Sequence, residues 1–193
     1  VRDQTLAVSG LLSNKMYGPS VKPPQPEGIW QTVYNGESWT EAEGEDRYRR
    51  GLYTFIKRTS PYPSFVTFDA GSREVCLSQR IVTNTPLQAL VTLNDPVYVE
   101  AASYLGKLMN DSSSKPSEAI AFGYRKLMLS PISDQKLEAL ISLYENSHAE
   151  FKQDSAAVNS FFKIKDMEAT PEMAAMAVVA NALLNLDEFL TKP

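Results

Sequence analysis

The sequence predicts a mainly α-helical domain: an irregular multi-helix arrangement with a long structured loop and one small β-hairpin. Capping side chains stand directly before prolines at three places, the arrangement preferred at the first turn of a helix. These pairs are Thr85-Pro86, Asp95-Pro96 and Thr170-Pro171. Apolar residues recur at helical spacing through the C-terminal half of the chain. No internal repeat of about 20 to 50 residues is present, which argues against a solenoid of stacked helices.

Residues 1–40 are expected to form an N-terminal helix, a proline-rich connector and the hairpin. The first residues have the pattern of the middle of an amphipathic helix that lacks an N-cap and ends near Gly10 or at Ser13-Asn14. We therefore interpret the chain as an excised C-terminal fragment of a longer multidomain protein. Prolines between residues 17 and 28 fix extended backbone. They predict a stiff connector lying over the core, with a polyproline ligand as the alternative. Asn35-Gly36 is typical of a type I′ turn and predicts the hairpin.

A helix is predicted from Glu41 to about Arg58. Acidic residues precede arginines by four positions here, in the orientation that stabilises a helix. These pairs are Glu43–Arg47, Glu45–Arg49 and Asp46–Arg50. The helix must end before Pro61, because residues preceding a proline are pushed out of the helical conformation. Residues 61–82 show no clear period, and since about 20 residues is long for a passive connection, we expect this loop to carry a site.

The rest of the chain is predicted to be helical. The expected helices cover residues 86–93, 96–110, 116–129, 134–150 and 171–186. A further short helix is indicated within residues 151–166 by Val158, Phe161 and Phe162. We therefore expect residues 1–193 to form a single helical domain, with its helical core in residues 41–193.

The composition excludes several classes of protein. Hydrophobic residues make up 43% and charged residues 22% of the 193 residues, which is ordinary for a globular chain. The net charge of −4 argues against nucleic acid as a partner, and no apolar run approaches the roughly 18 residues that membrane insertion requires. A single cysteine, Cys76, excludes a disulfide within the chain, a multi-cysteine metal site and covalent haem attachment. We expect no metal or cofactor in this chain, a buried Cys76 and a surface-exposed His148.

Four carboxylates are candidates for acid–base catalysis: Asp69, Glu74 and Asp95 are the best, and Glu100 is the fourth. Asp95 is expected to cap the helix that starts at Pro96. Asp69 follows an apolar run, so we expect a buried ion pair between its carboxylate and an arginine. The candidate arginines are Arg58, Arg73 and Arg80. The alternative is a hydrolase acting on a carbohydrate-like substrate, in which Asp69 works with Glu74 or Asp95.

Candidate ligand-binding residues fall into a cationic and an amide group. Arg58, Arg73 and Arg80 lack obvious acidic partners in the sequence and are suited to bind a carboxylate or phosphate, or to dock a neighbouring domain. Amide side chains gather around two helix starts, where they satisfy backbone groups or, alternatively, bind a polar molecule such as a sugar. These amides are Asn84, Gln88 and Asn94.

An ordered series of motifs covers nearly the whole chain. The motifs include residues 18–28 (GPSVKPPQPEG), 44–55 (GEDRYRRGLYTF), 83–90 (TNTPLQAL), 93–96 (LNDP) and 183–190 (LLNLDEFL). The series closely resembles the C-terminal domain of unknown function of large planctomycete-type cytochrome c proteins. It is far more specific than any one of its motifs.

The resemblance implies an exported bacterial protein, located in the periplasm or at the cell surface, whose N-terminal part often carries a c-type haem domain. Haem c would then belong to another part of the parent protein. The expected partners are the neighbouring domains of the same polypeptide and an extracellular polysaccharide or protein. Together, these observations favour a non-catalytic accessory domain over an enzyme. If the neighbouring domain is missing, an exposed apolar patch should mark the former interface.

Overall fold

The structure is a computed structural model that describes residues 1–30, 38–71, 76, 78–79, 83–164 and 167–191. It is 60% helical, with nine α-helices and no β-strand in the part described, so the predicted mainly α-helical class is confirmed. Extended pairing in these residues is limited to two isolated bridges, Ser13 with Arg49 and Val21 with Thr54. The turn of the predicted hairpin, Asn35-Gly36, lies outside the described residues.

The helices match the expected ranges closely in the C-terminal two thirds of the chain. The α-helices are α1 (Arg2–Ser9), α2 (Pro63–Thr67), α3 (Pro86–Asn94), α4 (Pro96–Ser112), α5 (Pro116–Met128), α6 (Asp134–Gln153), α7 (Ser155–Phe161), α8 (Pro171–Leu184) and α9 (Asp187–Leu190). Two short 3₁₀ helices, η1 (Gly44–Tyr48) and η2 (Gly51–Tyr53), precede α2.

Local capping explains where these helices begin. Asp95 accepts a hydrogen bond from the Val97 N–H at 3.0 Å, and Thr170 accepts one from the Met173 N–H at 3.3 Å. At the start of α3, the Thr85 N–H donates to the side-chain oxygen of Gln88 at 3.3 Å. The helix starts predicted before prolines are therefore confirmed.

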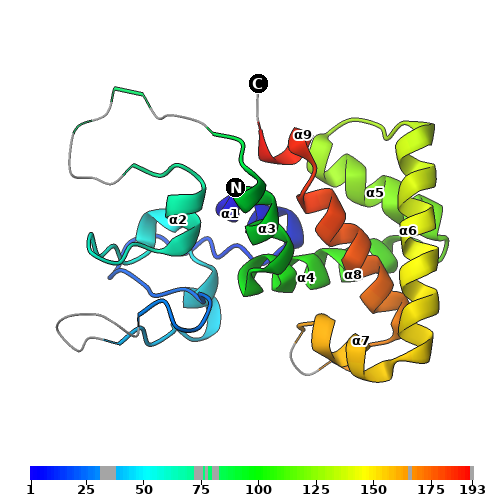
Figure 1. The fold of residues 1–193 in the computed structure, drawn as a ribbon, viewed down its shortest axis with the longest axis horizontal. Coiled ribbons are helices and arrows are strands. Elements are labelled where there is room, and N and C mark those ends of the chain that lie inside the picture. The colour runs from blue at the N-terminus through cyan, green and yellow to red at the C-terminus, as the bar shows by residue number, and fades with distance from the viewer. Residues whose placement is uncertain (31–37, 72–75, 77, 80–82, 165–166, 192–193) are drawn as a thin grey trace.

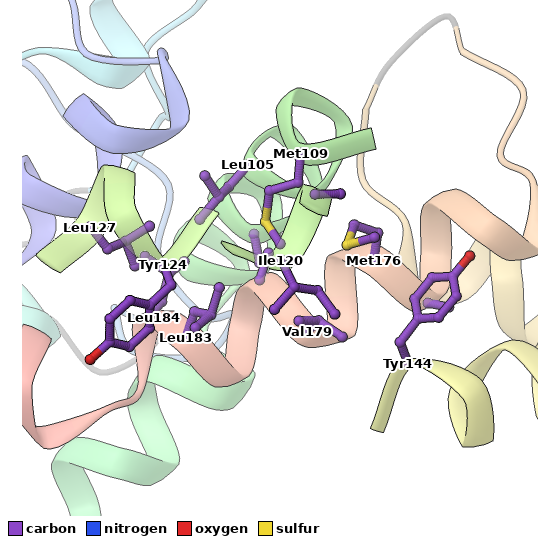
Figure 2. Packing of buried hydrophobic residues seen from close by; sticks show 14 of the residues in the cluster. Leu105, Met109, Ile120, Tyr124, Leu127, Tyr144, Met176, Val179, Leu183 and Leu184 are labelled. Carbon is purple, nitrogen blue, oxygen red and sulfur yellow. The ribbon is translucent and has the colours of Figure 1, made fainter. Parts of the chain in front are cut away.

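Helix α8 lies at the centre of the C-terminal helices and packs against α4, α5, α6 and α7 (Figure 1). Its apolar residues meet those of α4 and α5 in the buried cluster of Figure 2, where Met109, Ile120 and Val179 are close neighbours. Gly106 of α4 lets the two helices approach closely, because a Cβ placed there would lie 2.7 Å from the Cα of Ala177. Backbone contact between α4 and α8 thus fixes the core to which the remaining elements attach.

The predicted helix from Glu41 to Arg58 is wrong. The segment forms only η1 and η2, and within the described residues the arginines do not pair with acids four positions earlier. Arg47 instead contacts Glu41 at 3.1 Å. The Arg49 side chain is buried and donates to the carbonyls of Pro19, at 3.1 Å, and Tyr17. Contacts with other parts of the chain therefore override the helix that the local charge spacing favours.

Helix α1 ties this irregular segment to the helical core. The Arg2 guanidinium donates to the carbonyl oxygens of Arg49 at 2.9 Å and Arg47 at 3.0 Å. The Asp3 carboxylate accepts from the Gly51 N–H at 2.8 Å. Since α1 also packs on α4, these bonds position η1 beside the start of α4.

The proline-rich connector lies against the chain that follows it. The Val21 N–H donates to the Tyr53 carbonyl at 2.8 Å, and the Tyr62 hydroxyl donates to the Pro24 carbonyl at 2.7 Å. The Trp39 indole N–H donates to the Pro23 carbonyl at 2.8 Å. The connector is thus a packed part of the fold.

Candidate functional site

Asp69 lies just after α2, with its backbone at a φ of 55°. One oxygen of its carboxylate accepts two hydrogen bonds from Thr83, from the backbone N–H and from the side-chain hydroxyl, each at 2.8 Å. These bonds hold the pKa of Asp69 below its usual range. The Asp69 carboxylate therefore fastens the chain before α3 to the end of α2.

Of the three arginines predicted to pair with Asp69, Arg58 alone lies within the described residues. Arg58 is exposed and forms no ion pair with Asp69 in the part of the chain that is described. Arg73 and Arg80 lie outside the described residues, as does the predicted acid Glu74. The structure thus places Asp69 in a hydrogen-bonded corner and leaves the Arg73 and Arg80 pairings as predictions.

The three candidate amides all have partners within the fold. Gln88 is buried and donates to the Thr67 carbonyl at 2.9 Å. Asn84 donates to the Asp187 carboxylate at 3.0 Å, which links the start of α3 to α9. Asn94 donates to the Leu90 carbonyl at 2.9 Å, one turn earlier on α3. In these contacts the three amides bond groups of the fold itself. This is the first of the two roles predicted for them, and binding a polar ligand is the second.

Asp95 is a buried cap, as predicted, and burial raises the pKa of its carboxyl. Two other expectations need correction. Cys76 is exposed, because it lies in the long loop away from the helical core. His148 is partly buried: its ring stacks on Tyr144 with centroids 5.6 Å apart, and its Nε2 lies 2.9 Å from the Glu172 carboxylate.

Helix α3 has the reverse of the usual arrangement of polar and apolar side chains. Its buried residues are the polar Gln88 and Thr92, whereas Leu87, Leu90 and Leu93 are 56%, 57% and 42% exposed. The single hydroxyl hydrogen of Thr92 has three acceptors within reach, the carbonyls of Gln88 at 3.1 Å and Ala89 at 2.9 Å and the side-chain oxygen of Asn185 at 2.5 Å, so the hydroxyl is satisfied inside. The leucines, spaced three residues apart, form one outward stripe. We call Leu87, Leu90 and Leu93 the α3 leucine stripe.

An open cavity of about 580 Å³ lies where the corner between α3 and α4 meets η1 and the end of α7. Its walls combine charged, polar and apolar side chains. The lining residues are Arg47, Leu93, Asn94, Pro96, Val99, Glu100, Ser160, Phe161, Lys163 and Ile164. Asn94 and Glu100 were singled out from the sequence, but Lys163 was not, because nothing local to residues 160–164 indicates that they meet α4.

Glu100 is the carboxylate of this cavity. It accepts a hydrogen bond from the Tyr48 hydroxyl at 2.7 Å, and its second oxygen lies 3.9 Å from the Arg47 guanidinium. Burial and the bond to Glu100 raise the pKa of Tyr48 to about 12, so this hydroxyl stays a donor at neutral pH. Arg47 also contacts Glu41, so the charge of Glu100 is shared within a network of four residues.

The described residues contain neither a metal-binding cluster nor a helix that could span a membrane. No group of three or more histidine, cysteine, aspartate or glutamate side chains there is close enough to hold a metal ion. No helix in those ranges has both the length and the hydropathy to cross a bilayer.

The hydrogen bonds to Asp69 lead to a pH-dependent prediction. Because the pKa of Asp69 is lower in the folded state, its contribution to stability is present above its unfolded pKa and is lost as the pH falls through the folded value. Thr83→Ala removes the hydroxyl bond and keeps the backbone bond, so the Asp69 pKa should rise part of the way back. Carboxyl carbon chemical shifts followed by NMR against pH measure this directly. An unchanged Asp69 titration in the Thr83→Ala variant would contradict the assigned cause.

Comparison with known proteins identifies the family to which this chain belongs. A family model described as PSD1, Protein of unknown function (DUF1553), matches residues 1–144. No curated protein matches the chain. No solved structure matches it either. The family match covers most of the chain and agrees with the resemblance seen in the motifs, so the chain belongs to the PSD1 family of proteins of unknown function (DUF1553).

Proposed function

We propose that this chain is a non-catalytic accessory domain that docks, through the α3 leucine stripe, against a neighbouring domain of the same polypeptide. The reversed polarity of α3 carries the proposal. A helix on the surface of a globular protein normally directs its apolar side inward, yet here Leu87 and Leu90 are more than half exposed while Gln88 is buried. Contiguous exposed apolar surface of this kind marks an interaction site.

The chemistry of the stripe favours a permanently attached partner. α3 contains no charged residue, so it offers no electrostatic steering to a freely diffusing partner. Three leucines make a small patch compared with the roughly 800 Å² that each partner of a stable complex buries. A domain linked through the chain reaches an effective concentration in the millimolar range, at which a small apolar contact is enough for docking.

The contacts of the predicted catalytic residues support a non-catalytic role. The Asp69 carboxylate is engaged by Thr83 and the Asp95 carboxylate by the Val97 N–H, so the two acids have separate structural partners. Glu74, the other acid of the hydrolase hypothesis, lies outside the described residues.

The compartment is part of the same proposal and rests on the resemblance stated above. A parent protein of that type is exported, so we place the domain in the periplasm or at the cell surface. In this proposal a haem c, where the parent protein carries one, lies in another part of the polypeptide, and the further partner is an extracellular polysaccharide or protein.

The test is a charge placed in the stripe of the full-length polypeptide. Leu90→Glu should increase the rate of limited proteolysis between the two domains several-fold, because a buried unpaired carboxylate is unfavourable in an apolar contact. Leu129→Glu is the matched control, since Leu129 is 88% exposed and lies after α5, outside the stripe. Equal proteolysis rates in the Leu90→Glu variant, the control and the parent sequence would exclude docking through α3.

A further inference from the structure

We propose that the cavity between α4 and α7 binds an amphipathic monocarboxylate, a small organic acid with a ring or short chain as its apolar body. The cavity holds about 580 Å³, within the range of small-molecule sites. This site adjoins the proposed docking surface at Leu93, which belongs to both, but its other walls come mainly from α4 and from residues 160–164.

Apolar side chains from two helices line the cavity. Pro96 and Val99 come from the first turn of α4, and Phe161 comes from the end of α7. Phe161 is held in place by its contact with Phe151 of α6, with ring centroids 6.2 Å apart. The apolar walls are thus fixed by packing and suited to a flat or compact apolar group.

The charged residues that line the cavity are two cations, Arg47 and Lys163, and one anion, Glu100. Glu100 accepts a hydrogen bond from the Tyr48 hydroxyl and lies 3.9 Å from the Arg47 guanidinium, which also contacts Glu41 at 3.1 Å. Lys163 adds a cation: in the part of the chain that is described, no carboxylate lies within ion-pair distance of its ammonium group. Its backbone N–H donates to the Ser103 hydroxyl of α4 at 3.1 Å, which anchors the residue at the cavity wall.

These observations define the class of ligand. The Lys163 ammonium group, which has no carboxylate partner among the described residues, favours a single anionic group, and the apolar walls favour a hydrophobic body attached to it. A multiply charged anion such as phosphate would meet the Glu100 carboxylate in the same space.

Phenylacetate is a suitable probe, with phenylacetamide as its neutral analogue and acetate as the anion without an apolar body. In titration calorimetry with the 193-residue chain or the full-length polypeptide, phenylacetate should bind on the order of tenfold more tightly than either analogue. Its affinity should fall with added salt, because Lys163 is exposed and its charge is screened.

Variants separate the two parts of the site. Lys163→Gln should weaken phenylacetate on the order of fivefold, as expected for an exposed ion pair, and leave phenylacetamide unchanged. Ser160→Trp, at an exposed position of α7, should fill the cavity and abolish binding of both ring compounds without unfolding the chain. Lys126→Gln, at an exposed position of α5, is the charge-matched control and should change nothing. Absence of phenylacetate binding, equal affinity for phenylacetamide, or insensitivity to Lys163→Gln each overturns the proposal.

Discussion

Gly106→Val is expected to lower the free energy of unfolding by about 3 kcal/mol, as overpacking of a close helix contact does. A Cβ at Gly106 would lie 2.7 Å from both the Cα and the N of Ala177, and these are backbone atoms that cannot rotate away. Helices α4 and α8 must therefore move apart, which loosens the buried cluster between them (Figure 2). Urea unfolding followed by circular dichroism measures the change.

The control for Gly106→Val separates packing from helix propensity. Ala149→Val places the same β-branched residue at an exposed position of α6 and should cost well under about 1 kcal/mol. If the two variants lost equal stability, close contact between α4 and α8 could not be what organises the core.

Arg49→Met should be about as destabilising, by about 3 kcal/mol, because it leaves carbonyl groups without donors. The Arg49 side chain is 1% exposed, donates to the carbonyls of Pro19 and Tyr17, and stacks 3.8 Å over the Tyr53 ring. Methionine fills similar space but donates nothing, so the connector loses its attachment to the segment between η1 and η2.

Arg58→Met is the matched control for Arg49→Met. Arg58 is exposed, so its replacement should change the free energy of unfolding by less than about 0.5 kcal/mol. Thermal unfolding of the two variants side by side provides the comparison. Similar melting temperatures would show that the buried carbonyl contacts of Arg49 contribute little.

The C-terminal helices were predictable because their ends are specified locally. A capping side chain followed by proline determines where α4 and α8 begin, as Asp95 and Thr170 show. The left-handed Gly10, at a φ of 80°, likewise ends α1, at the first of the two positions expected for its end. Such signals need no knowledge of the rest of the fold.

The segment from Glu41 to Arg58 was mispredicted because its interactions are distant in sequence. Arg49 donates to carbonyls 30 and 32 positions away, and Tyr48 donates to Glu100 across 52 positions. Local charge spacing favours a helix by only about 0.2–0.5 kcal/mol per pair, which the buried arginine contacts outweigh. Gly44, at a φ of 56°, further interrupts a helix that the pairs alone would allow.

The cavity was only partly visible in the sequence for the same reason. In the sequence, Asn94 stands out as an amide near a helix start, Glu100 as a candidate acid, and Arg47 only as a partner of Glu43 in the predicted helix. Lys163 and Phe161 join them only through the packing of α7 and the residues after it. The reversed polarity of α3 was also hidden, since a run such as residues 87–93 does not show which side faces the core.

Hydroxyl-radical footprinting of the full-length polypeptide tests most directly whether a neighbouring domain covers α3. Leu87 and Leu90 are 56% and 57% exposed in this domain and Leu129 is 88% exposed, so without docking their exposure differs by less than twofold. Docking predicts that Leu87 and Leu90 are modified many times more slowly than Leu129. Modification at rates in proportion to these exposed fractions would show that the α3 leucine stripe stays open to solvent, contradicting the proposed role.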